Sequence, residues 1–401
     1  MALEFFKHRV ATLYSLFYGG QFVLLGVQLP FFAGWLHVRG FAASEIGLIT
    51  GAALIARLAF GPAAAFWADH QDDERRALRI VSFIFALGAA ALIFAPGKWL
   101  IGAAAVTVIF AFGLLVPLTD AAVLRADRNG HLHFGQTRAV GSFVFLAATL
   151  IGGALLTRLG ISAVVWAMAG AAAFAFLVSL ALPKGAGKSD SAKPVSWREA
   201  PKLLANPIFI AVLFSAGLTQ GAHAVYYAFS YLRWEAIGYS ALTIGLLWAT
   251  GVIAEIILLA RMRSTALRFG PAALLALGGA GAAIRWTITA MEPPLWVLFL
   301  TQTLHALTFA AAYIGAIEFL DRAVPTRLVN TGMTLMSTTG VGAITGLATV
   351  IAGFIWQGQG VWHGLMQGPA TAYLMMAAMG AGAFVIALLV ARLWDGGRLF
   401  D

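Results

Sequence analysis

The feature that most constrains this chain is a series of twelve apolar stretches, each long enough to form a helix that crosses a membrane. They cover roughly residues 10–35, 45–67, 79–95, 99–122, 136–157, 162–182, 207–232, 241–260, 271–290, 295–318, 328–355 and 370–392. A spanning helix needs about 20 mostly apolar residues, whereas transmembrane strands are shorter and alternate in polarity. The sequence therefore predicts an all-α polytopic membrane protein with twelve transmembrane helices.

The composition excludes a soluble alternative. Hydrophobic residues make up 61% of the 401 residues and charged residues 11%, whereas soluble domains are about 45–50% apolar and about 25% charged. A soluble fold of this length has too little interior to bury so much apolar surface. The chain has no cysteine, which excludes disulfides, a thiol nucleophile and a cysteine metal site.

The distribution of positive charge predicts the topology. With the N-terminus placed in the cytoplasm, 20 of the 26 Lys and Arg residues fall in cytoplasmic segments and four in outer loops. This bias follows the positive-inside rule and places both termini in the cytoplasm. The net charge of +9 is spread over seven segments that face anionic lipid. We therefore expect membrane lipid, and no nucleic acid, as the partner of these residues.

The longest polar stretch divides the chain into two halves. Residues 183–205 contain five Lys or Arg and three Pro, and they separate six predicted helices in residues 1–182 from six in residues 206–401. We interpret the stretch as a cytoplasmic linker between two six-helix bundles. Because each half has an even number of helices, the halves should form a parallel repeat.

One segment shows this repeat directly. Residues 46–57 read IGLITGAALIAR and residues 244–255 read IGLLWATGVIAE, so Arg57 in the first copy corresponds to Glu255 in the second. If the halves face each other across a pseudo-twofold axis, the two charges lie at equal depth on equivalent helices. They then form either a salt bridge between the halves or opposite walls of a charged cavity.

Few other charged residues lie inside the predicted helices, and such residues commonly mark substrate or proton pathways. Asp120 and Arg138 lie near the cytoplasmic ends of adjacent helices, so they can pair, either structurally or around a substrate. Glu318, also near a cytoplasmic end, is expected to be solvated. His223 lies in the seventh helix beside Gln220.

Three deeper groups follow an order of depth. At about 1.5 Å per residue, Arg285 lies roughly 9 Å, His305 roughly 16 Å and Glu255 about 22 Å from the outer ends of their helices. A direct bridge between Glu255 and Arg285 is therefore not expected, because His305 lies between them in depth. His305 is either a plain buried histidine or part of a pathway. Burial favours the neutral form of a carboxyl group and a nearby cation favours the charged form, so Glu255 is a candidate proton carrier.

Several stretches resemble one family. They are PLTDA at 117–121, GQTRAVGS at 135–142, QGAHAVYYAFS at 220–230, GYSALTIGLLWATGVIAE at 238–255, IRW at 284–286 and TQTLHALTF at 301–309. With the twelve-helix plan they resemble the major facilitator superfamily, and within it the branch of 3-phenylpropionate permeases, which is related to lactose permease and nucleoside–proton symporters.

The resemblance implies alternating access and proton symport across a bacterial inner membrane. In lactose permease, an acid in helix 4 and an arginine in helix 5 bind sugar, and helices 8, 9 and 10 carry an acid, an arginine and a histidine. The positions that match these by helix and residue type are Asp120, Arg138, Glu255, Arg285 and His305. Two departures stand out. Thr308 replaces a proton-carrying glutamate, and the signature after helix 2 is degraded to WADHQDDERR at 67–76.

The remaining motifs point to structure rather than catalysis. The sequence has no P-loop, no His-Glu-x-x-His and no Gly-x-Ser-x-Gly motif, so we expect neither an enzyme nor a cofactor. His131 and His133 lack a third ligand and are interpreted as a solvated loop rather than a metal site. Gly47-x-x-x-Gly51 and Gly342-x-x-x-Gly346 predict close packing of helices 2 and 11. We expect the protein to be a monomer.

The sequence therefore predicts a proton-coupled secondary transporter that imports a small organic anion. Arginine binds carboxylates through two parallel hydrogen bonds, and rings on helices 7 to 9 can stack on an aromatic acid such as a phenylpropionate. A sugar or nucleoside–proton symporter and an exporter of amphiphilic compounds remain alternatives. The predicted substrate-binding residues are Arg57, Asp120, Arg138, His223, Tyr227, Trp248 and Arg285, and the predicted proton-coupling residues are Glu255 and His305.

Overall fold

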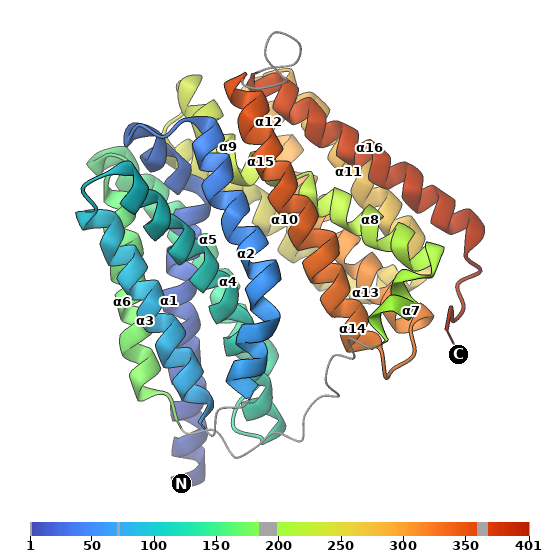
Figure 1. Ribbon diagram of the computed structural model, residues 1–401, viewed down its shortest axis with the longest axis horizontal. Helices are drawn as coiled ribbons and strands as arrows, with labels where there is room; N and C mark the ends of the chain where they lie inside the picture. The colour runs from blue at the N-terminus through green and yellow to red at the C-terminus, as the bar shows by residue number, and fades with distance from the viewer. Residues whose placement is uncertain (1, 70–72, 184–198, 359–367, 401) are drawn as a thin grey trace. The chain divides into compact units, whose positions relative to one another are not determined.

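The computed structural model describes residues 2–69, 73–183, 199–358 and 368–400, and the regular structure within these ranges is helical. In the first half of the chain every span is one uninterrupted helix (Figure 1). These helices are α1 (Ala2–Val38), α2 (Ala43–Asp69), α3 (Glu74–Phe94), α4 (Lys98–Arg128), α5 (Phe134–Leu159) and α6 (Ala163–Ala181).

The second half of the chain contains more, shorter elements. They are α7 (Ala200–Leu204), α8 (Pro207–Gly221), α9 (Ala224–Ala236), α10 (Ala241–Phe269), α11 (Pro271–Ala290), α12 (Leu295–Thr303), the π-helix η1 (Ala306–Ala311), α13 (Ala312–Ala323), α14 (Val329–Leu335), the π-helix η2 (Met336–Ala343), α15 (Ile344–Gln357) and α16 (Pro369–Leu393). Three spans are therefore interrupted, which the apolar stretches did not predict.

The interruption between α8 and α9 has a local cause. The Gln220 carbonyl oxygen accepts hydrogen bonds from the backbone N–H groups of Ala222 and His223 and lies 3.2 Å from Nδ1 of the His223 ring. This carbonyl would bond the N–H of residue 224 in a continuous α-helix. The competing bonds end α8 and leave His223 in a turn.

Among the described residues, twelve helical segments are long and apolar enough to cross a membrane, which confirms the predicted fold class. Their bounds lie within a few residues of the apolar stretches, except where helices extend past the membrane-length core. Most of the predicted linker, residues 184–198, lies outside the described residues, and its end forms α7. The predicted domain boundaries stay a prediction.

By internal contacts the chain forms two compact units. Unit 1 comprises Met1–Ala42, Ala52–Ser191 and Ser230–Leu246. Within it α1 packs against α5 and α6, and α3 packs against α4 and α6. The centre of α1 is accordingly buried, and its polar side chains meet groups of α4 and α5 rather than lipid.

Unit 2 comprises Ala43–Gly51, Ala192–Phe229 and Leu247–Asp401. Within it α11 and α16 run side by side (Figure 1), and α16 also packs against α8. An apolar cluster closes one end of the unit, where the ring of Trp394 packs edge-on against Phe319. The chain after α16 joins this cluster, because the Leu399 N–H donates to the Ala323 carbonyl oxygen at 2.9 Å.

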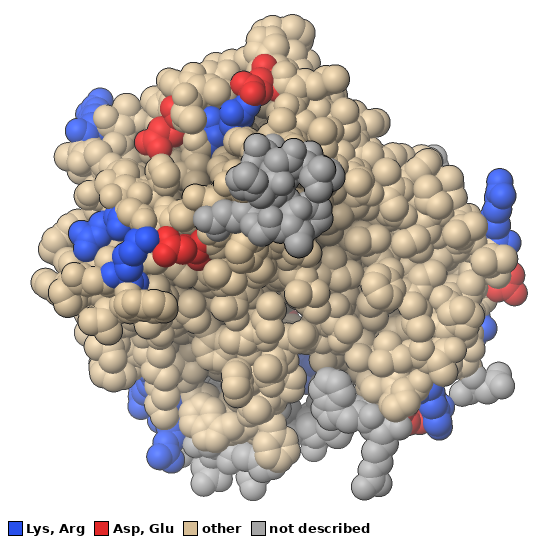
Figure 2. Space-filling model, turned by 45° about the horizontal axis from the view of Figure 1, so that its top comes forward, with Lys and Arg blue, Asp and Glu red and all other residues tan. Residues whose placement is uncertain are grey.

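The surface carries many large apolar side chains, as expected for lipid contact. Examples are Trp99, Phe94 and Phe143, which are 94%, 76% and 71% exposed. The face in Figure 2 is mostly uncharged, with Lys, Arg, Asp and Glu in small groups. This distribution agrees with twelve spanning helices.

Two glycines at matching positions of the repeat make the same kind of helix contact. In unit 2 a Cβ on Gly47 of α2 would lie 2.8 Å from the Thr349 carbonyl oxygen of α15. In unit 1 a Cβ on Gly245 of α10 would lie 2.9 Å from the Thr149 carbonyl oxygen of α5. Each contact requires a residue without a side chain, so both copies of the repeat use glycine to bring two backbones together.

The predicted packing of helices 2 and 11 is confirmed, with one change of residue. Gly51 of α2 faces the Gly346 carbonyl oxygen, which lies 2.8 Å from an added Cβ. Gly342 does not take part. A Cβ there would meet only the Ser337 carbonyl oxygen of its own helix. Residue 342 lies in the π-helix η2, whose different turn rotates it away from α2.

The degraded signature at 67–76 is described only in part, because residues 70–72 lie outside the described ranges. Asp73 caps α3, and its carboxylate accepts from the backbone N–H of Arg75 at 3.1 Å. The Arg75 guanidinium pairs with the same carboxylate at 2.5 Å. This pairing holds the pKa of Asp73 below its ordinary value. The segment therefore acts at least as a helix cap.

Candidate functional site

A polar cluster in unit 1 joins three helices. The Tyr18 hydroxyl of α1 donates to Oδ1 of Asp120 on α4, and Nε of Arg138 on α5 lies 3.4 Å from the same oxygen. The predicted pairing of Asp120 with Arg138 is confirmed. Each of the two side chains keeps 31% of its surface exposed. A solute can therefore contact the pair without a rearrangement of the surrounding helices.

Aromatic rings support the arginine of this cluster. The Arg138 guanidinium lies 4.6 Å from the ring centroid of Phe22 and 5.6 Å from that of Tyr18. Cation–π contacts of this kind fix the orientation of a guanidinium. Tyr18 was not among the predicted site residues, because nothing in the sequence singles it out in a helix with several aromatic residues.

Arg57 lies on α2 in unit 1, and its side chain is exposed. Among the described residues it has no hydrogen-bond or ion-pair partner, and its aliphatic stem rests against Gly113 of α4. Glu255 belongs to unit 2. The equivalence of Arg57 and Glu255 as facing residues therefore stays a prediction.

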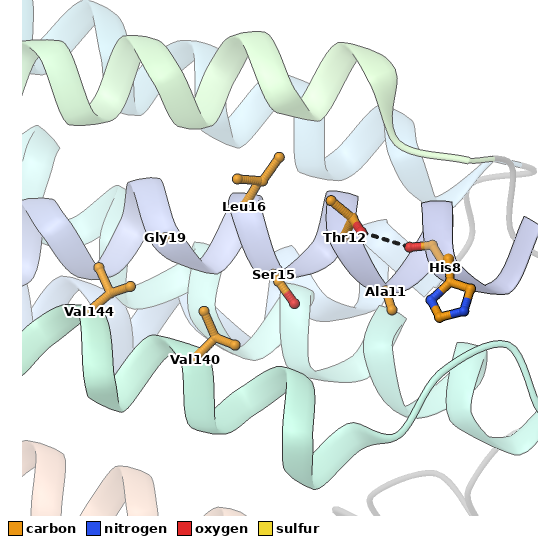
Figure 3. A pocket seen from close by; sticks show the side chains of 8 residues that line it. All are labelled: His8, Ala11, Thr12, Ser15, Leu16, Gly19, Val140 and Val144. Atoms are coloured by element: carbon orange, nitrogen blue, oxygen red, sulfur yellow. Dashed lines mark hydrogen bonds between the residues drawn. The ribbon is translucent and has the colours of Figure 1, made fainter. Parts of the chain in front are cut away.

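A shallow hollow of about 360 Å³ lies between α1 and α5 (Figure 3). Its lining residues are His8, Ala11, Thr12, Ser15, Leu16, Gly19, Val140 and Val144. Thr12 donates to the His8 carbonyl oxygen at 2.8 Å, so that hydroxyl is already used within α1. None of the predicted site residues lines the hollow, and the candidate site lies elsewhere.

The second polar cluster lies in unit 2 around Arg285 of α11, which is fully buried. Its guanidinium donates from Nη2 to the Gln302 side-chain oxygen at 2.6 Å and from Nη1 to Nδ1 of His305 at 3.1 Å. On the other side of the imidazole, His305 Nε2 lies 3.5 Å from Oε2 of Glu255. The groups thus form a row from Glu255 through His305 and Arg285 to Gln302, in the order that their depths predicted.

The row fixes the tautomer of the neutral His305 ring. An arginine can only donate hydrogen bonds, so the Nδ1 atom that faces Arg285 must accept. The single ring proton then lies on Nε2, where it points to the Glu255 carboxylate. In this arrangement the imidazole links the carboxylate to the cation without itself being charged.

His223 joins the cluster from the turn between α8 and α9. Its Nδ1 faces the Gln220 carbonyl oxygen and must donate, so its Nε2 accepts from the Thr308 hydroxyl at 3.0 Å. The same hydroxyl lies 3.4 Å from Nη1 of Arg285 and accepts from it. Thr308 therefore connects His223 to the cation.

Aromatic rings enclose the second cluster. The rings of Tyr226 and Trp248 stack with centroids 4.2 Å apart, and the Arg285 guanidinium lies 4.3 Å from the Trp286 ring and 4.8 Å from Tyr226. Tyr227 stacks on His223 at 5.4 Å. The predicted stacking residues Tyr227 and Trp248 thus belong to the same group of rings as Tyr226, and in this conformation their faces contact other rings of the protein.

Several buried donors in this cluster lack an acceptor among the described residues. They are Nε of Arg285, Nε2 of Gln302 and the indole N–H groups of Trp248 and Trp286. Buried donors without partners are costly, and this cluster holds four of them, one on the Arg285 guanidinium itself. The arrangement suits an incoming group that offers lone pairs or negative charge.

Glu318 lies apart from both clusters. Its carboxylate accepts from Nη2 of Arg322 at 2.6 Å, one turn along α13, and its side chain is 22% exposed. Contrary to the expected solvation, it is mostly covered and paired within its own helix. In the part of the chain that the structure describes, no group of three His, Asp or Glu side chains is arranged to hold a metal ion.

The sequence matches a family model and curated transporters over most of its length. The MFS_1 like family matches residues 11–364. The chain is 30% identical to the probable 3-phenylpropionic acid transporter of Escherichia coli (strain K12) over 359 residues, which cover 87% of this chain and 92% of that one. It is 25% identical to maltose permease of Geobacillus stearothermophilus, over 86% of this chain and 88% of the relative.

Solved structures share the fold. A mutant of the nucleoside transporter NupG superposes with a TM-score of 0.80 at 18% identity, over 96% of this chain and all of the other. The D-xylose-proton symporter superposes with a TM-score of 0.69 at 13% identity, over 98% of both chains. These likenesses show the fold, and the family model and the relative in Escherichia coli confirm the resemblance that the sequence motifs indicated.

Proposed function

The chain belongs to the MFS_1 like family of the major facilitator superfamily, and from this premise we propose that it imports a small organic anion together with protons. It is a multi-pass membrane transporter, and its homologues and fold are those of transporters rather than enzymes. The proposal concerns its substrate, its coupling and its orientation.

The row Glu255–His305–Arg285 is the observation that carries proton coupling. A carboxyl group that is linked to a cation only through a neutral imidazole can be charged or neutral. The equilibrium between these two forms shifts when the imidazole or the cation moves. A change of conformation can therefore load a proton on one side of the membrane and release it on the other. Here Glu255 is the proton carrier and His305 the group that modulates it.

An aromatic carboxylate, similar to 3-phenylpropionate, is the substrate class we propose. The relative in Escherichia coli bears the name of a probable 3-phenylpropionic acid transporter. Arg57 and Arg138 of unit 1 and Arg285 of unit 2 are the proposed sources of positive charge. The rings of Tyr227 and Trp248, which pack against each other in unit 2, are the proposed apolar surface. Asp120 and His223 complete the proposed binding residues.

Sugars and nucleosides form the second candidate class. Maltose permease and the nucleoside transporter NupG are both similar to this chain, and an aspartate paired with an arginine can bind hydroxyl groups as well as accompany an anion. Export of amphiphilic compounds is the alternative direction. We further propose a monomer without a cofactor in a bacterial inner membrane, with both termini in the cytoplasm.

Uptake into proteoliposomes tests the proposal. Radiolabelled 3-phenylpropionate, maltose, uridine and an amphiphilic cation are offered to the purified protein, each with and without an inward proton gradient. We expect 3-phenylpropionate to accumulate only when the gradient is present. Accumulation of maltose or uridine instead would favour the second class, and gradient-independent equilibration of the acid would remove proton coupling from the proposal.

A further inference from the structure

Arg57 occupies an unusual position for a charged residue. It lies near the middle of α2, 14 residues after Ala43 and 12 before Asp69, which places it about 18–21 Å from either helix end. Half of a bilayer's hydrocarbon core is about 15 Å thick, so its side chain cannot extend along the helix to reach the headgroups. A charge at this depth normally faces water or a partner.

The structure gives Arg57 no such partner. Its side chain is exposed, and among the described residues no carboxylate, carbonyl or hydroxyl is bonded to it. The two other arginines of the candidate site differ in this respect. Arg138 pairs with Asp120, and Arg285 is fully buried between Gln302 and His305.

A glycine on the neighbouring helix makes room for this arginine. A Cβ on Gly113 of α4 would lie 2.8 Å from Cδ of Arg57, and Gly113 is buried. The stem of Arg57 therefore lies in a gap that only glycine leaves open, and the gap determines where the guanidinium points. A side chain at position 113 would push the arginine out of this place.

Gly113 also relates Arg57 to the polar cluster of unit 1. Residues seven apart share one face of an α-helix and are about 10 Å apart along it, so Gly113 and Asp120 share a face of α4. An anion held by Arg57 thus has the Asp120–Arg138 pair two turns away along that helix, within reach of the remainder of the solute.

We propose that Arg57, positioned by Gly113, is the residue that binds the carboxylate of the substrate. The inference rests on the proposed function for the identity of that substrate, whereas the anion site itself follows from the geometry of unit 1. Arg138 stays paired with Asp120 and contacts the uncharged part of the solute.

Chemical labelling tests the anion site without relying on transport. The chain has no cysteine, so Gly61→Cys creates a single thiol. A Cβ at position 61 would lie 3.9 Å from Cγ of Arg57, an ordinary contact. The thiol is labelled in proteoliposomes with 2-sulfonatoethyl methanethiosulfonate, which is anionic, and with its cationic 2-trimethylammonioethyl counterpart. The ratio of the two rates reports the local charge.

We expect the anionic reagent to be favoured, and Arg57→Gln in the Gly61→Cys background to lower the ratio about tenfold, as a unit charge a few ångströms away requires. Gly113→Leu should lower it in the same direction by displacing the guanidinium. Gly170→Leu is the matched control, because Gly170 has open space around its Cα. A thiol that neither reagent reaches, or a ratio unaffected by Arg57→Gln, would overturn the proposal.

Adding unlabelled 3-phenylpropionate separates this inference from the proposed function. Protection of the thiol by the acid, but not by 3-phenylpropanamide, supports both. An Arg57-dependent ratio without protection by the acid leaves the anion site standing and rejects 3-phenylpropionate as its occupant. Protection that persists unchanged in Arg57→Gln places the carboxylate elsewhere and overturns the assignment to Arg57.

Discussion

The polar clusters of the two units are built from similar residues in opposite ways. In unit 1, Asp120 and Arg138 stand on uninterrupted helices, touch each other directly and remain partly exposed. In unit 2, Glu255 and Arg285 are separated by His305, and the arginine is fully buried. The first arrangement is neutral and accessible, and the second keeps acid and cation apart in a closed space.

The helix breaks follow the same division. The turn that carries His223 and the π-helix η1 that follows His305 both lie in unit 2. Interrupted helices in transporters often form sites that change during transport, and π-helical segments are frequent at functional sites. Unit 1 is therefore suited to holding a solute, whereas unit 2 is suited to changing the protonation state of Glu255.

Substitution of Arg285 should have the largest effect. Arg285→Gln removes the charge-assisted hydrogen bonds to Gln302, His305 and Thr308, each worth about 1.5–3 kcal/mol, and leaves their buried acceptors without this donor. We expect substrate exchange, normalised to the amount of folded protein, to fall more than a hundredfold. Arg285→Lys should recover little, because an ammonium cannot reproduce the planar fork. A loss below threefold would mean that the buried row has no part in transport.

Substitution of Arg138 should have a smaller effect, and a second substitution at Asp120 should partly compensate for it. Arg138→Gln leaves a carboxylate unpaired near the proposed anion site, so we expect the affinity for 3-phenylpropionate to fall about tenfold. Equilibrium binding of the labelled acid measures this. The double variant Asp120→Asn with Arg138→Gln restores charge balance and should regain part of the affinity. Unchanged affinity in Arg138→Gln would give the pair a purely structural role.

Substitution of Thr308 has the smallest expected effect and tests whether its hydroxyl belongs to the polar network of unit 2. Thr308→Val keeps the shape but removes the hydroxyl between His223 and Arg285. A net loss of about 1 kcal/mol corresponds to a fivefold slower exchange. Thr289→Val is the matched control, since that hydroxyl bonds only the Arg285 carbonyl oxygen of its own helix. Equal rates for the two variants would remove Thr308 from the network.

The sequence was sufficient for the fold and for part of the site. Spanning helices can be predicted from the sequence because the bilayer, and not tertiary contacts, sets their length and apolar content. The Asp120–Arg138 pair was readable because both residues lie at the same end of adjacent helices. The order of Glu255, His305 and Arg285 followed from their depths, which depend only on helical rise.

The remaining features depend on contacts that periodicity does not encode. Nothing local marks Tyr18 as the partner of Asp120, because its role arises from the packing of α1 against the other helices of unit 1. The break at His223 depends on a competition for one carbonyl oxygen. Gly342 is absent from the contact with α2 because it lies within the π-helix η2, whereas Gly346 lies in the α-helix that follows.

We propose that Glu255 in unit 2 carries the coupled proton while unit 1 holds the solute. The most direct measurement compares Glu255→Gln with the wild type in two assays, accumulation of 3-phenylpropionate driven by a proton gradient and exchange at equilibrium. Gln mimics the protonated carboxyl, so the account predicts that accumulation is abolished and exchange, which needs no net proton release, is largely kept. Accumulation to the wild-type level by Glu255→Gln would show that Glu255 does not carry the coupled proton.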